Sequence, residues 1–374
     1  MESTTATDPV HAARVALIRD AFFRLNGIEP RPKLDLHPHD DMSWPETLKL
    51  PPVDAAFEYL RSGHEALTVM ENALEAFGRP LGKQAAVLDF ASGFGRMLRF
   101  LSKRLPTDRV FASDLMRETT RFTQATFGVH SFPSAADPRE IAFPRRFSAI
   151  WVGSLFTHLP PPRFAEFLSV LAGQLEPDGV LLFSTHALDE SVEGGHKFQV
   201  TGENPQLDEH EYGLAWTEAT FVPRLCEELG LRYGGTNVRD LWRIQDVHAV
   251  LGPEVEPAGE WRPTPIARGG TYRVDREGAR VRLEGCTNVP KRYLPIDRVL
   301  AHVGDTHFET GLSPTVIDST PQEGGAMFPM QGFSIEGSRA DLPPGDVPIV
   351  IETRFGGGHR SLLSGYVEPA WNGE

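Results

Sequence analysis

The stretch Ala85-Ala86-Val87-Leu88-Asp89-Phe90-Ala91-Ser92-Gly93-Phe94-Gly95-Arg96 decides the fold of this chain. Its apolar beginning predicts a buried strand, and its two glycines predict a tight turn. The residues from Met97 onward predict a helix. Glycine has no Cβ and tolerates positive φ, so a ligand can approach the backbone of such a turn closely. A dinucleotide fingerprint would place a third glycine three residues after Gly95, where this chain has Leu98. A pyrophosphate is therefore not the expected ligand.

Outward from this stretch, to about residue 252, short apolar runs alternate with amphipathic segments. This pattern predicts a parallel sheet covered by helices on both faces. We expect strands at 85–90, 109–112, 148–152, 180–184, 231–238 and 246–251, and helices at 97–104, 117–127, 163–175 and 220–229. The segment 187–216 is much longer than the usual connection of ~2–6 residues, and it contains His196, His210 and Tyr212. Connections of this length are usually functional and often lids, but the sequence leaves open whether this one closes over a site.

The two ends of the chain have different patterns. Residues 1–82 predict a helical N-terminal arm, in which a proline-rich stretch from 28 to 53 lies over the surface between two amphipathic helices. After Pro253, β-rich runs separated by Gly, Pro and Asp turns predict a separate all-β module over 266–374. The expected fold class is α/β, with a Rossmann-like domain over 83–252 between these two extensions.

Composition narrows the function classes. The chain has 374 residues and a net charge of −14, and a charge of that sign repels nucleic acid. It has no run of ~18 apolar residues that would predict a membrane span, and its beginning lacks a secretory signal, so the expected location is the cytoplasm. The two cysteines, Cys226 and Cys286, lie far apart and predict buried apolar side chains rather than a disulfide or a zinc site.

The central region resembles the class I S-adenosylmethionine-dependent methyltransferases. Their first motif is an apolar strand ending in an acidic residue and followed by Gly-x-Gly, which Asp89, Gly93 and Gly95 match. Their second strand ends in an acidic residue that accepts the ribose hydroxyls, and Val110-Phe111-Ala112-Ser113-Asp114 supplies Asp114. The resemblance implies a seven-stranded sheet and S-adenosyl-L-methionine as the cofactor. The implied cofactor-binding residues are Asp89, Ala91, Gly93, Gly95, Arg96, Asp114 and Ser154.

A narrower resemblance concerns the acceptor. Trp151-Val152-Gly153-Ser154-Leu155-Phe156-Thr157-His158-Leu159, Ser184-Thr185-His186 and Tyr212-Gly213-Leu214 resemble a bacterial subgroup found with glycosyltransferases in polysaccharide loci. The C-terminal module is similar to β-sandwich appendages of such enzymes. This implies O-methylation of a sugar or glycan precursor, with glycosyltransferases as pathway partners. The alternatives are another small metabolite, a lipid or a protein side chain as acceptor, or a non-catalytic adaptor that keeps the fold.

Three residues are candidates for work on the acceptor. A hydroxyl acceptor benefits from a base within hydrogen-bond reach, and histidine suits neutral pH. His158 and His186 both follow strands at the carboxyl edge of the sheet, where ligands bind in open α/β folds, and Tyr212 is a candidate to hold the acceptor. A capping or packing role remains the alternative for each. The run His37-Pro38-His39-Asp40-Asp41 contains metal-ligand types, but without further ligands it favours a solvated arm, and no metal is expected.

Overall fold

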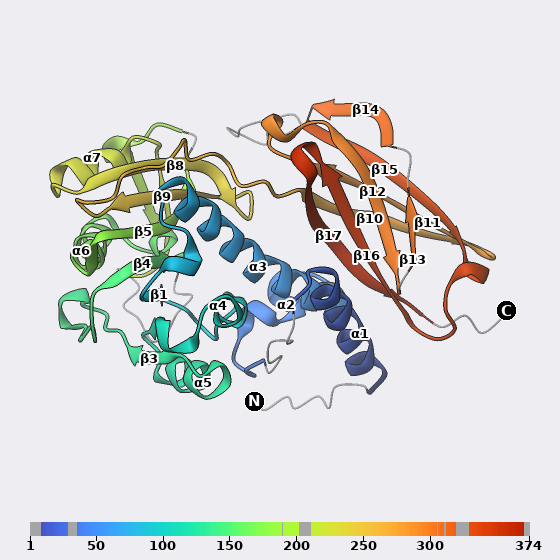
Figure 1. Ribbon diagram of the computed structural model, residues 1–374, viewed down its shortest axis with the longest axis horizontal. Helices are drawn as coiled ribbons and strands as arrows, with labels where there is room; N and C mark the ends of the chain where they lie inside the picture. Colours follow the sequence, from blue (N-terminus) through green and yellow to red (C-terminus); the bar gives the residue numbers. More distant parts are fainter. Residues whose placement is uncertain are drawn as a thin grey trace.

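The computed structural model describes residues 9–28, 36–188, 190–201, 211–304, 306–309, 312–318 and 329–369, with the backbone alone at 270–272, 312–318 and 329. Two β-rich parts lie at opposite ends of the molecule, and the long helix α3 and helix α1 lie between them (Figure 1). The α-helices are α1 (Pro9–Leu25), α2 (Pro45–Leu48), α3 (Pro52–Ala76), α4 (Leu98–Arg104), α5 (Arg117–Phe127), α6 (Pro161–Gly173) and α7 (Phe221–Glu228). No helix in these ranges is long and apolar enough to cross a membrane.

The first part is built on one mixed sheet. Its strands are β1 (Val87–Phe90), β2 (Val110–Asp114), β3 (His130–Pro133), β4 (Phe147–Val152), β5 (Leu175–Ala187), β6 (His196–Gln199), β7 (Leu214–Thr217), β8 (Arg232–Leu241) and β9 (Gln245–Leu251). The order β3-β2-β1-β4-β5 is parallel throughout, β9 pairs antiparallel with β5, and β8 pairs antiparallel with β9. The expected Rossmann-like α/β sheet is confirmed.

Successive side chains along the strands pack into two separate hydrophobic cores, one on each face of the sheet. In β1, Val87 belongs to the core beneath α3 and α4, whereas Leu88 and Phe90 belong to the core that includes α6 and α7. This alternation follows from the two-residue period of a strand. All residues of β1, β4 and β9 are buried, as expected for strands covered on both faces.

Sequence patterns located most of these elements, with two informative misses. Helix α5 has the predicted bounds, and Gly128, in the left-handed region at φ +70°, ends it. Strand β3 was not predicted, because its four residues are half-buried or exposed and carry no apolar period. The insert also holds structure: β6 and β7 form a hairpin whose β7 pairs with the end of β5, so the sheet has nine strands rather than seven.

Part of the insert lies outside the described residues. These are residues 189 and 202–210, which include His210 and the acidic residues Glu203, Asp208 and Glu209. His196, in β6, packs its ring against Phe164 and Phe221, so the described part of the insert rests on the core side of α6 and α7.

The N-terminal helices join the two parts of the molecule rather than lying only on the surface. Ile18 of α1 and Phe57 of α3 are buried in the same core as Leu362 of the C-terminal module. A Cβ placed on Gly365 would lie 2.6 Å from the Phe57 ring and 2.7 Å from Ile18, so a side chain there would disrupt this contact. Before α3, the predicted extended arm contains the short helix α2 and a single helical turn at Asp41–Ser43.

The C-terminal module consists of two four-stranded antiparallel sheets. Its strands are β10 (Arg268–Glu277), β11 (Arg280–Asn288), β12 (Ile296–Val303), β13 (Thr306–Glu309), β14 (Leu312–Asp318), β15 (Pro329–Ser338), β16 (Val347–Phe355) and β17 (His359–Glu368). The sheet orders are β10-β11-β15-β14 and β13-β12-β16-β17. Leu283 and Ile335 from one sheet share a hydrophobic core with Val299 and Ile351 from the other. The kinship of this module to glycan-enzyme appendages stays a prediction.

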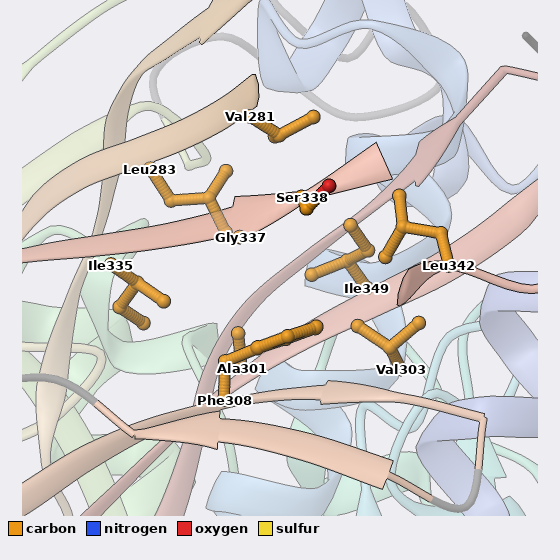
Figure 2. Close-up of a pocket in the computed structure, with 10 residues that line it drawn as sticks. All are labelled: Val281, Leu283, Ala301, Val303, Phe308, Ile335, Gly337, Ser338, Leu342 and Ile349. Atoms are coloured by element: carbon orange, nitrogen blue, oxygen red, sulfur yellow. The ribbon is translucent and has the colours of Figure 1, made fainter. Parts of the chain in front are cut away.

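An apolar hollow of about 290 Å³, part of it open to solvent, lies between the two sheets of this module. Figure 2 shows Val281, Leu283, Ile335 and Ile349 around it, with Phe308 at one side. Its lining offers no charged group, so it is a gap in the core of the module rather than a place for chemistry.

Candidate active site

The glycine turn after β1 is shaped by three residues with left-handed backbone: Ala91 at φ +56°, Gly93 at φ +52° and Gly95 at φ +80°. The two glycines differ in their surroundings. A Cβ on Gly93 would meet nothing within 4 Å, whereas a Cβ on Gly95 would lie 2.5 Å from the Phe127 ring. Gly93 therefore borders open space that a ligand can enter, and Gly95 allows the turn to pack against the end of α5.

Asp114 lies at the carboxyl end of β2, beside this turn. Its Oδ2 accepts a hydrogen bond from the Gly93 N–H at 2.9 Å, and its Oδ1 accepts one from the Met116 N–H at 3.0 Å. Burial raises the pKa of Asp114, and the two backbone N–H groups oppose that rise. These two N–H groups occupy one acceptor position on each oxygen, and Thr119 and Leu115 also interact with the carboxylate.

Asp89 lies within β1 and is buried. Burial, and then the charge of the Asp114 carboxylate, raise its pKa to about 8 against the opposing effect of Arg96. Near neutral pH the Asp89 carboxyl group is therefore mostly protonated in the ligand-free protein.

Arg96 does not extend into solvent as a surface arginine would. Its guanidinium lies 4.3 Å from the centre of the Trp242 ring, which comes from the turn between β8 and β9. Trp242 in turn donates its backbone N–H to Glu65 at 2.8 Å and its indole N–H to the Ser62 carbonyl at 3.0 Å. Helix α3 thus holds the aromatic ring against which Arg96 stacks, a contact that no sequence pattern indicated.

A second polar group forms where β4 and β5 end and the antiparallel strand β9 begins. Ser154 follows β4 with φ +66°, and its N–H donates to Ser184 Oγ at 2.9 Å. Gln245 Oε1 accepts from Ser184 Oγ at 2.7 Å, and Gln245 Nε2 donates to Ser154 Oγ at 3.0 Å. The Gln245 side chain therefore connects three strand ends and fixes the backbone at Ser154.

His158 is oriented by the insert. Its Nδ1 lies 2.7 Å from the Gly213 carbonyl oxygen, and the Gly213 N–H donates to the His158 carbonyl at 3.0 Å. The Tyr212 ring stacks on the imidazole at 4.8 Å with an interplanar angle of 7°. A carbonyl only accepts hydrogen bonds, so Nδ1 carries the proton in the neutral imidazole and the basic lone pair is on Nε2.

His186 has a different environment. Burial, and then the charge of nearby His158, lowers the pKa of His186 to about 4. Its Nε2 lies 3.5 Å from Gln245 Nε2, and its ring lies 6.2 Å from that of Trp216. His186 is therefore neutral near pH 7 and a weak base in the ligand-free protein.

Comparison with known proteins identifies the central region. Residues 87–179 match the family described as methyltransferase domain. The chain carries a methyltransferase domain. The expectations of a class I S-adenosylmethionine-dependent methyltransferase, and of S-adenosylmethionine as its cofactor, are confirmed. A search of the curated proteins finds no match to the chain.

Several solved structures are similar to this methyltransferase. One is the 1,6-didemethyltoxoflavin-N1-methyltransferase of Burkholderia thailandensis, at 17% identity and TM-score 0.39, covering 68% of this chain and 94% of that one. A TehB-like methyltransferase of Corynebacterium glutamicum is 19% identical with TM-score 0.35, covering 50% and 86%. The glycopeptide N-methyltransferase MtfA is 14% identical with TM-score 0.35, covering 45% and 82%.

The structure gathers the candidate residues into two groups at the carboxyl edge of the sheet. One group surrounds the glycine turn and contains Asp89, Ala91, Gly93, Gly95, Arg96 and Asp114; the other contains Ser154, His158, His186 and Tyr212. The sequence assigned no role to Ser184 or Gly213, although both lie in quoted motifs. Their part is visible only through contacts with residues far along the chain.

Proposed function

We propose that this methyltransferase transfers a methyl group to a hydroxyl of a sugar or glycan precursor. The observation that carries the proposal is the hydrogen bond of 2.7 Å between His158 Nδ1 and the Gly213 carbonyl. This bond orients the imidazole beside the carboxyl edge of the sheet, as a general base for an alcohol acceptor requires.

The glycine turn fits the cofactor. The open space at Gly93 admits a ligand against the backbone, and the carboxylate of Asp114, which is bound to the Gly93 N–H, is a suitable acceptor for the ribose hydroxyls. Asp89 is close enough to Asp114 for their charges to interact, and it is the group we assign to the methionine ammonium. S-adenosylmethionine, when bound, would supply an electrophilic methyl group. The side chains of this protein would hold the cofactor, orient the acceptor and accept its proton.

His158 is the proposed base. With Nδ1–H donated to Gly213, Nε2 can accept the proton of the acceptor hydroxyl as its oxygen attacks the methyl carbon. The imidazolium that forms is stabilised by the same carbonyl, because the Nδ1–H bond strengthens when the ring is charged. His186 has a low pKa and contributes a neutral polar surface rather than a second base.

The surroundings of His158 support a polyhydroxyl acceptor. The Tyr212 ring and the half-buried Trp216 ring provide flat apolar surfaces. Arg163 pairs with Glu211 at 2.6 Å, which adds donors and acceptors next to Tyr212 in the sequence. The resemblance to bacterial enzymes of polysaccharide loci supports the same acceptor class, with glycosyltransferases as pathway partners.

Calorimetric titration of S-adenosylhomocysteine into the purified chain tests the cofactor site. Asp114→Ala should weaken binding by about 1–3 kcal/mol, because charge-assisted hydrogen bonds to the ribose are lost. Asp108→Ala is the matched control, since exposed Asp108 precedes the opposite end of the same strand. Unchanged affinity in Asp114→Ala would contradict the assignment.

The acceptor is tested by methyl transfer from labelled cofactor to a panel of nucleotide sugars and oligosaccharides, beside phenols, amines and peptides. Transfer to sugars that His158→Ala abolishes supports the proposal. Transfer to another class with no activity on sugars contradicts it.

A further inference from the structure

Three side chains of metal-ligating type meet next to the glycine turn. His37 and His39 belong to the segment 36–44 that precedes α2, and Glu118 lies in the first turn of α5. His37 Nε2 is 3.5 Å from Glu118 Oε1, and His39 Nδ1 is 3.0 Å from Glu118 Oε2. One ligand atom from each of the three residues lies within 4.8 Å of the other two.

The two nitrogen–oxygen distances run to different oxygens of Glu118, and each is close to the ligand spacing around a tetrahedral zinc ion. With metal–ligand bonds of about 2.0–2.1 Å, neighbouring ligand atoms of a tetrahedron lie about 3.3 Å apart. Two imidazoles and one carboxylate suit zinc, whereas magnesium and calcium prefer oxygen ligands alone. The ion would find three protein ligands and a position for water.

The site is both accessible and supported from beneath. The His39 and Glu118 side chains are 66% and 44% exposed, so an ion can enter from solvent. The His37 side chain is only 19% exposed, and its ring stacks on Phe94 at 4.4 Å with an interplanar angle of 7°. The Phe94 ring therefore holds the His37 imidazole in one plane before any ion arrives.

Binding through His37 Nε2 has one identifiable cost. In the ligand-free protein, His37 Nδ1 accepts a hydrogen bond from the His39 N–H at 3.2 Å. When Nε2 holds a metal ion, Nδ1 carries the proton, so this long and exposed contact must open. The cost is small beside the bonds gained, because the contact is already exposed to water.

The simpler interpretation is a pair of ordinary histidine–glutamate contacts. Exposed ion pairs contribute about 0–1 kcal/mol each, and here they require charged histidines. It accounts for the convergence of both rings by separate contacts with the two oxygens of Glu118, and it assigns no function to the stacking of His37 on Phe94. It is also experimentally separable, since it predicts no stoichiometric metal uptake.

We propose that His37, His39 and Glu118 bind a zinc ion that fastens the segment 36–44 to the glycine turn and to α5. Phe94 stands between Gly93 and Gly95, so the zinc site is linked by one aromatic contact to the turn proposed to bind the cofactor. Zinc binding itself does not depend on methyltransferase activity, and it is measurable without any nucleoside.

The test uses the full chain, stripped of metal with a chelator and titrated with Zn²⁺ alone by calorimetry. We expect one ion per chain. His39→Ala and Glu118→Gln should each lower the affinity by at least the roughly 10–100-fold that loss of an outer-shell partner typically causes. His307→Ala is the matched control, because exposed His307 also lies near a glutamate, Glu309, at 3.6 Å, and it should leave zinc binding unchanged.

Two further measurements keep the result unambiguous. Circular dichroism verifies that the variants fold, which is expected since both altered side chains are exposed. Zinc should raise the melting temperature of the wild type and of His307→Ala but not of His39→Ala, because only a folded site binds the ion. Absence of one-to-one binding to the wild type, or equal affinity in Glu118→Gln, overturns the proposal. Asp114→Ala should bind zinc normally, which separates this test from that of the cofactor site.

Discussion

The two groups of residues at the carboxyl edge of the sheet are built in opposite ways. The cofactor side uses a continuous stretch, 89–96, and mainly its backbone: the positive φ of Gly93 and Gly95 shapes the turn. The proposed acceptor side takes its side chains from three segments, 154–158, 184–186 and 212–213, which Gln245 and Gly213 hold together. The proposed cofactor site is therefore shaped mainly by a local motif, whereas the proposed acceptor site depends on how the strands and the insert meet.

The two sides also share one electrostatic property. Burial keeps the proton on Asp89 and keeps His186 without one, so both groups are neutral near pH 7. These two groups therefore add no charge of their own to the region near pH 7. The comparison makes four predictions.

The largest effect is expected on the acceptor side. His158→Ala should lower turnover by about 10²–10⁴-fold, the usual contribution of a general base, with S-adenosylhomocysteine affinity unchanged. His186→Ala is the paired variant and should lose less, because a base with a pKa near 4 is weak. Steady-state kinetics and calorimetry measure both; equal losses, or lost cofactor binding in His158→Ala, would contradict the division into two sides.

The second prediction concerns the two glycines of the turn. Gly95→Ala should destabilise the fold by about 2–5 kcal/mol, from left-handed strain and from overpacking against Phe127. Gly93→Ala adds the strain alone, about 1–2 kcal/mol, because its Cβ meets nothing. Urea unfolding measures the stability. Gly93→Ala should mainly weaken S-adenosylhomocysteine binding, by more than its small loss of stability explains. Similar unfolding curves for the two variants would contradict this prediction.

The third prediction is a pH dependence. The pKa of Asp89 is about 8 in the folded protein and near 3.8, the ordinary value for aspartate, in the unfolded chain. Between these values the unfolded chain has released a proton that the folded protein keeps, so the Asp89 contribution to stability is full below about pH 4 and falls as pH rises to about 8. The slope is up to about 1.4 kcal/mol per pH unit.

Asp89→Asn removes this slope. The difference in unfolding free energy between variant and wild type, measured at pH 5 and at pH 7.5 in urea, should shift in favour of the variant at the higher pH. A difference that stays constant with pH would show that Asp89 ionises normally.

The smallest effect is expected from the aromatic stack. Tyr212→Leu removes the stacking of Tyr212 on His158, an interaction worth about 0.5–1.5 kcal/mol. Because the His158 ring is then less well ordered, turnover should fall by up to about tenfold. Tyr212→Phe keeps the ring and should retain most of the activity. If Tyr212→Phe loses as much as Tyr212→Leu, the hydroxyl contributes directly and the stack is not the cause.

Sequence patterns worked where local forces dominate. The bounds of α5, the buried strand β1 and the glycine turn all follow from nearest-neighbour chemistry: apolar period, a terminating glycine and left-handed backbone. Strand β3 and the hairpin of β6 and β7 were missed, since they are stabilised by pairing with other strands rather than by an apolar pattern of their own.

The sequence by itself determined the α/β sheet, the methyltransferase motif and the chemical types of the site residues, because these depend on residues close together in the chain. Only the tertiary structure decided which atoms of those residues are available: Gly213 orients His158, Trp242 holds Arg96, and Glu118 meets His37 and His39. The physical reason is that hydrogen bonds, stacking and burial act over a few ångströms in space. Strand order and helix packing bring distant residues within that range, and no local pattern records it.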